Sequence, residues 1–402
     1  MSDQHRQPNI SGMNSSEPSP STPVHVGQSR ERVLILSLAI LAGLFVVTAF
    51  LARQYHRSIH HLGDDWYAKG ESSLKSRDAA AAIQDYRNAL VYKPGDPTFE
   101  FHLAQALARS GRDELARSYF LTLLSASPGS GKLNLALARI AAQENSPASA
   151  VRYYHNAIYG VWEENPLSMR WQVRRELCQY LLDLGAVQEA QPDVIALAQE
   201  VSRSDYARQK ITADLLLRAA LWNRALDMYR SVLLADSRDH DALAGAGQAA
   251  FHLGRYGPAR NYFDRLPRER REAPEIAGMA GLSSLIEEMN PLLPGLPASE
   301  QRKRADAILG VATARLENCA QQRGITLPGK PPLDPFQQIY STGREMSRSW
   351  RRAADHASER AANAVSLAAR MEEAASERCG APQNRADQAV LLISQGSEGT
   401  SR

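Results

Sequence analysis

The chain has 402 residues, of which 44% are hydrophobic and only 7% aromatic, and its 47 Lys and Arg nearly balance its 44 Asp and Glu. This length allows two or three ordinary domains or one extended array, while the net charge of +3 excludes the strongly basic surface of a typical nucleic-acid-binding protein. Three cysteines exclude a disulfide-dense mini-domain, and the low aromatic content favours helices over a β-sandwich.

The N-terminal part divides into a polar tail and an apolar segment. Residues 1–32 are rich in Ser, Pro, Asn and Gln, which predicts a disordered tail. Residues 33–52 then carry no charge, between Arg32 and Arg53. At about 1.5 Å per residue, this segment spans roughly 30 Å, the thickness of the hydrocarbon core of a bilayer. The sequence therefore predicts one transmembrane helix over residues 33–52.

A cleaved signal peptide is the alternative interpretation of this segment. Small residues up to Ala49 resemble a processing site. However, a long polar tail precedes the apolar run, and the run is longer than the usual 7 to 15 residues of a signal peptide. We therefore expect an uncleaved anchor, with cleavage near Ala49 left open.

Positive charges around the segment decide its orientation only weakly. Arg30 and Arg32 precede it, and Arg53, Arg57 and Lys69 follow it. Because these counts nearly balance and long domains translocate largely regardless of charge, we expect a cytoplasmic tail and an exported body. The expected location is a bacterial inner membrane, with the body in the periplasm.

After a juxtamembrane linker at residues 53–62, the sequence repeats with a period close to 34. With Gly63 as position 1, small residues recur at positions 8 and 20, and a residue that is aromatic in five of six units recurs at position 24. The alanines at position 20, spaced by 34, 34, 40, 35 and 34 residues, are Ala82, Ala116, Ala150, Ala190, Ala225 and Ala259. The residues at position 24 are Tyr86, Phe120, Tyr154, Val194, Tyr229 and Phe263. The longer spacing marks a six-residue insertion at about residues 160–166.

This spacing resembles the tetratricopeptide repeat (TPR), in which two antiparallel helices share 34 residues, and the whole chain resembles a single-pass membrane-anchored bacterial TPR protein. The resemblance implies an all-α fold: an α-solenoid over residues 63–290, with about six repeats and a seventh helix. Small residues at positions 8 and 20 allow the helices to approach, and the ring at position 24 fills the space between units. Pro192 and Val194 predict an irregular fourth unit.

The resemblance also implies a concave groove, lined by the first helix of each repeat, that binds protein partners. The groove candidates carried over from the family are Tyr67, Glu71, Phe101, Gln105, Arg109, Leu135, Arg139, Gln143, Arg175, Gln179, Lys210, Asp214, Gln248 and His252. Arg109, Arg139 and Arg175 form a stripe that can pair with acidic groups of a partner. Tyr67 and Glu71 replace the Lys and Asn of the family's carboxylate clamp, so a chaperone tail is not expected as the ligand.

Other motifs give no support for catalysis or cofactor binding. Gly129–Lys132 resembles part of a phosphate-binding loop, but Ala126 and Leu133 occupy positions where that loop needs Gly and Ser or Thr. His56 and His60 lie one helical turn apart, a spacing that can chelate a metal, but an interfacial polar cluster explains them equally well. We therefore expect no metal, no cofactor, no small-molecule substrate and no enzymatic activity.

Residues 291–394 are predicted to form a helical cap, followed by a loose tail at 395–402. One helix ends near Gln322, and a second covers about residues 335–377 with a break or bend near Gly343. If the body is exported, Cys319 and Cys379 can form a disulfide. Its 60-residue loop would stabilise the fold by on the order of 4 kcal/mol. Two unrelated thiols are the alternative.

These features predict a membrane-anchored scaffold or adaptor that binds proteins, acting in an envelope-associated complex. One alternative is an accessory subunit that localises a membrane-bound enzyme or a secretion apparatus. A less favoured alternative is an enzyme whose site lies in residues 290–402.

Overall fold

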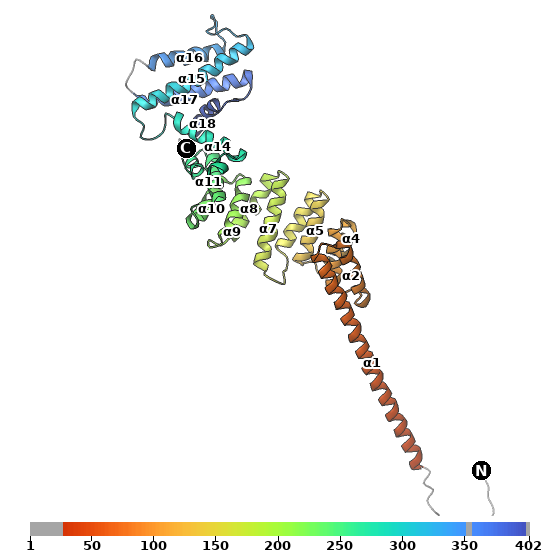
Figure 1. Ribbon diagram of the computed structural model, residues 1–402. Coiled ribbons are helices and arrows are strands. Elements are labelled where there is room, and N and C mark those ends of the chain that lie inside the picture. The colour runs from red at the N-terminus through yellow and green to blue at the C-terminus, as the bar shows by residue number, and fades with distance from the viewer. Residues whose placement is uncertain (1–26, 351–355, 399–402) are drawn as a thin grey trace, which may run out of the picture. The chain divides into compact units, whose positions relative to one another are not determined.

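The computed structural model describes residues 27–350 and 356–398, without the side chains of 27–30, 55–60, 350 and 396–398. These residues are almost entirely helical (Figure 1). Helix α1 spans Gly27–Lys75. The later helices are, in chain order, α2 (Ala79–Tyr92), α3 (Pro97–Arg109), α4 (Asp113–Ala126), α5 (Gly131–Gln143), α6 (Pro147–Ile158), α7 (Pro166–Asp183), α8 (Val187–Glu200), α9 (Tyr206–Arg218), α10 (Trp222–Ala235), α11 (His240–His252), α12 (Tyr256–Asp264), α13 (Arg268–Arg271), α14 (Pro274–Met289), α15 (Ala298–Arg323), α16 (Pro335–Trp350), α17 (Ala357–Cys379) and α18 (Arg385–Glu398).

Helix α1 corrects two expected boundaries. It begins at Gly27, inside the segment predicted to be a disordered tail, and it continues without interruption through the predicted linker at 53–62. The physical reason is that extending an existing helix costs little once its first turn has formed, so polar residues beside an apolar run join it. The apolar segment and the first helix of the array are therefore one continuous element of 49 residues. The rest of the predicted tail, residues 1–26, lies outside the described residues.

Local capping chemistry explains where many of the repeat helices begin. A side-chain oxygen before the first turn accepts a hydrogen bond from a backbone N–H that has no partner within the helix. The side chains that do so are Asp78 before α2, Asp96 before α3, Ser130 before α5, Asp205 before α9 and Asp239 before α11.

The chain divides into two compact units, residues 1–123 and 124–402. In the first unit α2 packs against α1 and α3. In the second, consecutive helices from α5 to α12 pack as helix–turn–helix pairs, and α14 packs against α11 and α12. The described residues contain one isolated parallel β-bridge, between Ser130 and Val161, and no longer strand.

The predicted repeat positions are the core of both units. All six alanines at position 20 are 0% exposed, and the six residues at position 24 are at most 3% exposed. A Cβ on Gly247, at position 8, would lie 2.5 Å from the ring of Phe263 at position 24. The small residues are therefore needed because the ring lies against the backbone of the first helix, as the repeat pattern predicted.

The fourth unit is more regular than expected. Pro192 lies inside α8, yet the helix runs continuously over Val187–Glu200, and Val194 is fully buried. Pro192 is six residues into the helix, where only its own missing N–H and the carbonyl four residues earlier are affected. The smaller Val194 takes the place of the ring.

The six-residue insertion folds back on the loop before α5. The N–H of Gly131 donates to the carbonyl of Val161 at 2.9 Å, and the N–H of Val161 donates to the carbonyl of Gly129 at 2.7 Å. The Trp162 indole N–H donates to the carbonyl of Ala157 at 2.9 Å. The insertion is therefore fixed by main-chain hydrogen bonds rather than forming a free loop.

The C-terminal helices α15 to α18 have a second core of their own, in which α15 packs against α16, α17 and α18. Helix α16 is not broken at Gly343, as the sequence had suggested; it continues to Trp350, and α17 begins at Ala357. Gly343 is tolerated inside the helix because the side chain of Met371 packs where a Cβ would lie. Helix α18 extends to Glu398, so residues 395–398 of the predicted loose tail are helical instead; residues 399–402 lie outside the described residues.

Candidate partner-binding face

The predicted groove residues lie on the first helices of the repeats, a surface that we call the first-helix face. The residues at position 9 of the six repeats, called the position-9 row for their shared place in the repeat, are Glu71, Gln105, Arg139, Gln179, Asp214 and Gln248. Half of this row is charged and half carries a neutral amide. The contacts of these side chains decide which of them are available to a partner.

In the first unit, Tyr67 and Glu71 belong to a polar and aromatic cluster. The hydroxyl of Tyr86 donates to Glu71 at 2.6 Å, and Nδ1 of His102 lies 2.7 Å from the same carboxylate. Nε2 of His102 lies 3.1 Å from the hydroxyl of Tyr67, whose ring stacks on Phe99 at 4.8 Å between centroids. Burial, followed by the Glu71 charge, raises the pKa of Tyr67, and burial raises that of Tyr86 further. Both phenols therefore stay protonated, and that of Tyr86 donates to Glu71.

The other first-unit candidates differ in exposure. The ring of Phe101 packs edge-on against Phe120, with centroids 5.6 Å apart, so it is half-buried in the interface of α3 and α4. Gln105 is half-buried and Arg109 is exposed. Arg109 is therefore the most accessible charged side chain among the five groove candidates of this compact unit.

In the second compact unit, residues 124–402, Arg139 of the third repeat is already paired. Its guanidinium donates two 2.8 Å hydrogen bonds to Glu176 on α7, and the hydroxyl of Tyr154 donates a third at 2.9 Å. Burial acts to raise the pKa of Glu176, but the hydrogen bonds from Arg139 and Tyr154 outweigh it, so the pKa lies below its usual value. This carboxylate stays ionised and ties α5 to α7.

Lys210 and Asp214 on α9 are paired as well. Nζ of Lys210 lies 3.1 Å from Asp239 and 3.4 Å from Asp241 on α11, and the hydrogen bond to Asp239 raises the pKa of Lys210. The hydroxyl of Tyr229 donates to Asp214. Burial raises the pKa of Asp214 despite this hydrogen bond. These contacts neutralise most of the charge that α9 carries on this face.

Positions 9 and 24 vary together along the array. Where position 24 is Tyr in the first and fifth units, position 9 of the same unit is acidic and accepts the hydroxyl hydrogen bond. Where position 24 is Phe in the second and sixth units, position 9 is Gln. In the third unit position 9 is Arg139, and the acceptor Glu176 comes from the next unit. The charged side chains at position 9 therefore bind the tyrosine hydroxyls directly, or, in the case of Arg139, bind the carboxylate that does so.

The other polar groove candidates in the second compact unit are three amides and one arginine. Gln143 and Gln179 are exposed, Gln248 is half-buried, and none of the three has a hydrogen bond to another described residue. Arg175 is half-buried, and its guanidinium lies 5.7 Å from the ring of Trp171. The arginine stripe is therefore divided: Arg139 is paired, Arg175 lies beside an aromatic ring, and the accessible polar groups are mostly amides.

The last two candidates are apolar or aromatic in character. Leu135 is buried, so it belongs to the core. The ring of His252 stacks on Trp222 with centroids 5.1 Å apart, and burial lowers the pKa of His252.

Sequence reasoning missed the partners of these residues. His102 and Glu176 both occupy position 6, which faces the ring at position 24 of the preceding unit. A polar residue at position 6 that follows a tyrosine at position 24 of the preceding repeat would have indicated these hydrogen bonds. Asp239 was missed because it serves both as a helix cap and as a partner of Lys210.

Metal and phosphate sites find no support within residues 27–350 and 356–398. No group of three or more potential ligand side chains occurs among the described residues. The backbone of Gly129–Gly131 is occupied by Val161, so it does not form an anion cradle. The side chains of His56 and His60 lie outside the described residues.

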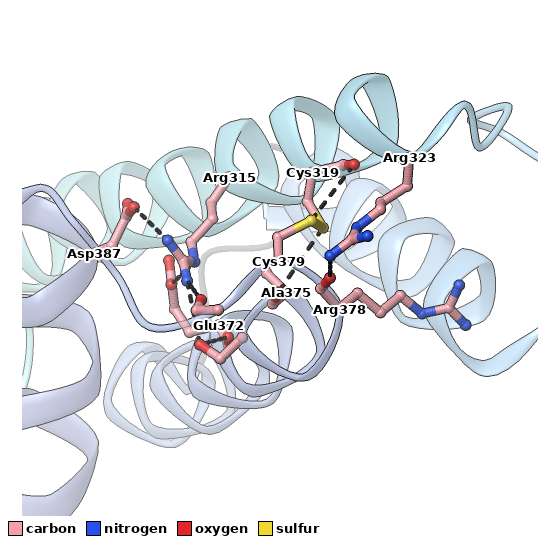
Figure 2. Close-up of a disulfide and its surroundings, with 10 residues drawn as sticks. Arg315, Cys319, Arg323, Glu372, Ala375, Arg378, Cys379 and Asp387 are labelled. Carbon is pink, nitrogen blue, oxygen red and sulfur yellow. Dashed lines mark hydrogen bonds and ion pairs between the residues drawn. A yellow bond between two sulfur atoms is a disulfide. The ribbon is translucent and has the colours of Figure 1, made fainter.

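The two candidate disulfide cysteines are joined in the structure (Figure 2). Cys319 near the end of α15 and Cys379 at the end of α17 form a disulfide, with Cα atoms 5.9 Å apart. Cys178 is a buried free cysteine at position 8 of the fourth unit, and burial raises its pKa to about 12. Cys178 is therefore a packing residue and a poor nucleophile.

Two segments, residues 67–131 and 212–274, match the sequence model of the tetratricopeptide repeat family. No curated protein matches the chain. Among solved structures, the chain is similar to YrrB, described as "a TPR protein with an unusual peptide-binding site", with 14% identity, 50% of this chain and 97% of that chain covered, and a TM-score of 0.38. PilF of Pseudomonas aeruginosa aligns with 14% identity, 56% and 97% coverage, and a TM-score of 0.40.

PilW, described as a "widely conserved type IV pilus biogenesis factor", aligns with 16% identity, 54% and 97% coverage, and a TM-score of 0.39. The two matched segments lie at opposite ends of the array, and the helix pairs between them repeat the same buried positions 8, 20 and 24. Residues 67–131 and 212–274 therefore carry tetratricopeptide repeats, and the described chain folds as an all-α helical repeat array of this type with a long apolar N-terminal helix.

Proposed function

We propose that this protein is a membrane-anchored, non-enzymatic scaffold that binds a protein partner on its first-helix face, as part of an envelope-associated complex. The observation that carries the proposal is the continuity of α1. The same helix contains a span long and apolar enough to cross a membrane, Glu31–Gln54, and the first helix of the array. About eight residues, or roughly 12 Å of helix, separate this span from Gly63.

Exposure of the apolar span supports an anchor. None of the Glu31–Gln54 segment is buried, and its large side chains, from Val33 to Leu51, are 54–74% exposed. A soluble protein rarely leaves so large a continuous apolar surface in water, whereas a bilayer covers it. A signal sequence near the N-terminus has the same composition, so the mature N-terminus must be measured.

The disulfide supports an exported array. Disulfides persist in the bacterial periplasm and are rare in the cytosol, where thiols are kept reduced. With the long body exported, the inner membrane would hold α1 with its N-terminal end in the cytoplasm. A reporter fused after Arg402 should then be active only outside the cytoplasm.

The amides at three of the groove positions indicate what kind of partner fits the first-helix face. The exposed Gln143 and Gln179 and the half-buried Gln248 each offer a donor and an acceptor, which suits the backbone of an extended peptide or the polar side of a partner helix. The paired state of Arg139 and Lys210 argues against strong attraction of a highly acidic partner.

Site-specific photocrosslinking in the native host tests this proposal. A photoreactive residue at Gln179 should trap the same partner as one at Gln143, while one at Glu189, exposed on the second helix α8, should not. Crosslinks from Glu189 alone, or equal yields from all three positions, would contradict binding on this face. Intact mass of the purified protein then decides between a retained anchor and cleavage near Ala49.

A further inference from the structure

One face of α15 holds the end of α17 at three successive turns (Figure 2). Arg315, Cys319 and Arg323 are four residues apart, so their side chains lie along one side of the helix. Cys319 is bonded to Cys379. Arg315 donates at 2.8 Å to the carbonyl of the residue after Cys379, and Arg323 donates to the carbonyl of the residue before it. The disulfide therefore lies between two arginine–carbonyl hydrogen bonds, and all three interactions join α15 to the end of α17.

Arg315 also connects α17 to α18. Its Nε lies 2.7 Å from the carboxyl group of Glu372, which is 0% exposed, and its Nη1 lies 3.2 Å from Asp387 on α18. Only residues 380–384 separate the disulfide-bonded end of α17 from the start of α18. The position of α18 thus depends on the chain segment that the disulfide holds.

Helix α18 covers the last helix of the array. It packs against α14, α15 and α17, and its Ala389, Val390 and Ile393 are at most 2% exposed. These side chains share one apolar core with Ile286 of α14. If α18 left this position, apolar surface on α14 and α15 would become exposed.

The two bonded cysteines differ in exposure. A pocket of about 640 Å³ is lined by both cysteines together with polar side chains, among them Asn318, Gln322 and Gln383. Within it Cys319 is only 3% exposed, whereas Cys379 is partly exposed. A thiolate entering from solvent therefore reaches the sulfur of Cys379 first.

We propose that Cys379 is a site of thiol–disulfide exchange with a dithiol reductant or oxidoreductase, and that exchange there releases α18 from the end of the array. The attacking thiolate forms a bond to Sγ of Cys379, the bond to Cys319 breaks, and Cys319 leaves as a thiolate that takes up a proton. The second thiol of the reductant then attacks the mixed disulfide and frees Cys379. The reductant is oxidised to a disulfide, and the protein gains two electrons and two protons.

The first experiment locates the attack. The full chain in detergent is treated with glutathione and quenched in acid, and adducts are mapped on the tryptic peptides 316–323 and 379–385, each of which carries one cysteine. The proposal predicts the glutathione adduct on the peptide of Cys379. An adduct mainly on the peptide of Cys319, or three free thiols before any treatment, would overturn it.

Hydrogen exchange tests the consequence. After reduction with dithiothreitol, amides of α18 and of the last turn of α17 should exchange about tenfold faster or more, while those of α5 to α11 keep their rates. C178S, which leaves the disulfide intact, should respond like the wild type. The double variant C319S/C379S should exchange fast with or without the reductant. Unchanged protection of α18 on reduction, or equal loss throughout the array, would contradict the release.

Discussion

The ring of Tyr86 lies directly against the backbone of Gly70, where an added Cβ would come within 2.6 Å of the ring carbon Cε1. The same relationship joins Gly247 and Phe263 in the last repeat. At these two positions glycine is therefore explained by the close approach of a ring and not by a turn. The hydroxyl of Tyr86 is fixed by Glu71, so the ring has little freedom to move away.

Replacement of Gly70 by alanine should destabilise the first repeat. Because the neighbour is a packed ring, G70A is expected to lower the free energy of unfolding by about 1–3 kcal/mol, measured by urea denaturation of the full chain in detergent. The control is G278A in α14, where nothing lies within 4 Å of the added methyl group. That variant should be stabilised by about 0.5–1 kcal/mol through helix propensity. Equal effects of the two variants would show that the ring contact does not limit position 8.

Substitution of Tyr229 and Asp214 tests whether the residue types at positions 24 and 9 depend on each other. Y229F removes the one side-chain donor that the described residues supply to Asp214, at an expected cost of about 1 kcal/mol, because Asp214 is itself exposed. Y229F/D214Q recreates the Phe and Gln combination of the second and sixth units, so it should recover most of this loss. Urea denaturation of the two variants measures both effects. A double variant no more stable than Y229F would refute the pairing rule.

Features that are set within one repeat could be predicted from the sequence, whereas contacts between side chains of different repeats could not. Positions 8, 20 and 24 were predictable because a 34-residue period places them on the same buried stripe in every unit, as the full burial of Ala82 and Ala259 shows. The partner of Arg139 was not, because Glu176 comes from the next unit, beyond the insertion that shifts the phase. The continuity of α1 was missed because composition marks apolar boundaries, whereas helices continue into polar sequence.

The Arg139–Glu176 pair should affect stability more than a fully exposed pair. R139Q is expected to cost about 1 kcal/mol, because the pair is bidentate but its side chains are 56% and 31% exposed. The matched control, R268Q, breaks the Arg268–Glu272 pair, whose side chains are 81% and 61% exposed. It should cost at most about 0.5 kcal/mol. A double-mutant cycle with E176Q, at low and high salt, measures the coupling; a coupling near zero would contradict the structural role of the pair.

The same pair gives a pH dependence with a definite sign. The pKa of Glu176 is lower in the folded chain than in the unfolded chain, so its contribution is fully present above the unfolded value of about 4.3. That contribution is lost as the pH falls through the lower folded value. Denaturation between pH 3 and 6 should therefore show a smaller acid loss for E176Q than for the wild type. An identical acid loss in both would mean that Glu176 titrates as it does in the unfolded chain.

Glu372 should have the opposite pH dependence. Burial, with the Asp387 charge adding to it, raises its pKa to about 8. Between the unfolded value of about 4.3 and pH 8, the folded chain keeps a proton that the unfolded chain releases, so this group destabilises the fold as the pH rises. E372Q keeps the shape of the side chain and an acceptor for Arg315 without the ionisable proton. It should be more stable than the wild type by on the order of 2 kcal/mol at pH 7 and nearly equal to it at pH 4. Urea denaturation of both proteins from pH 4 to 9 measures the difference, and a stability gap that stays constant over this range would show that Glu372 is ionised in the folded protein.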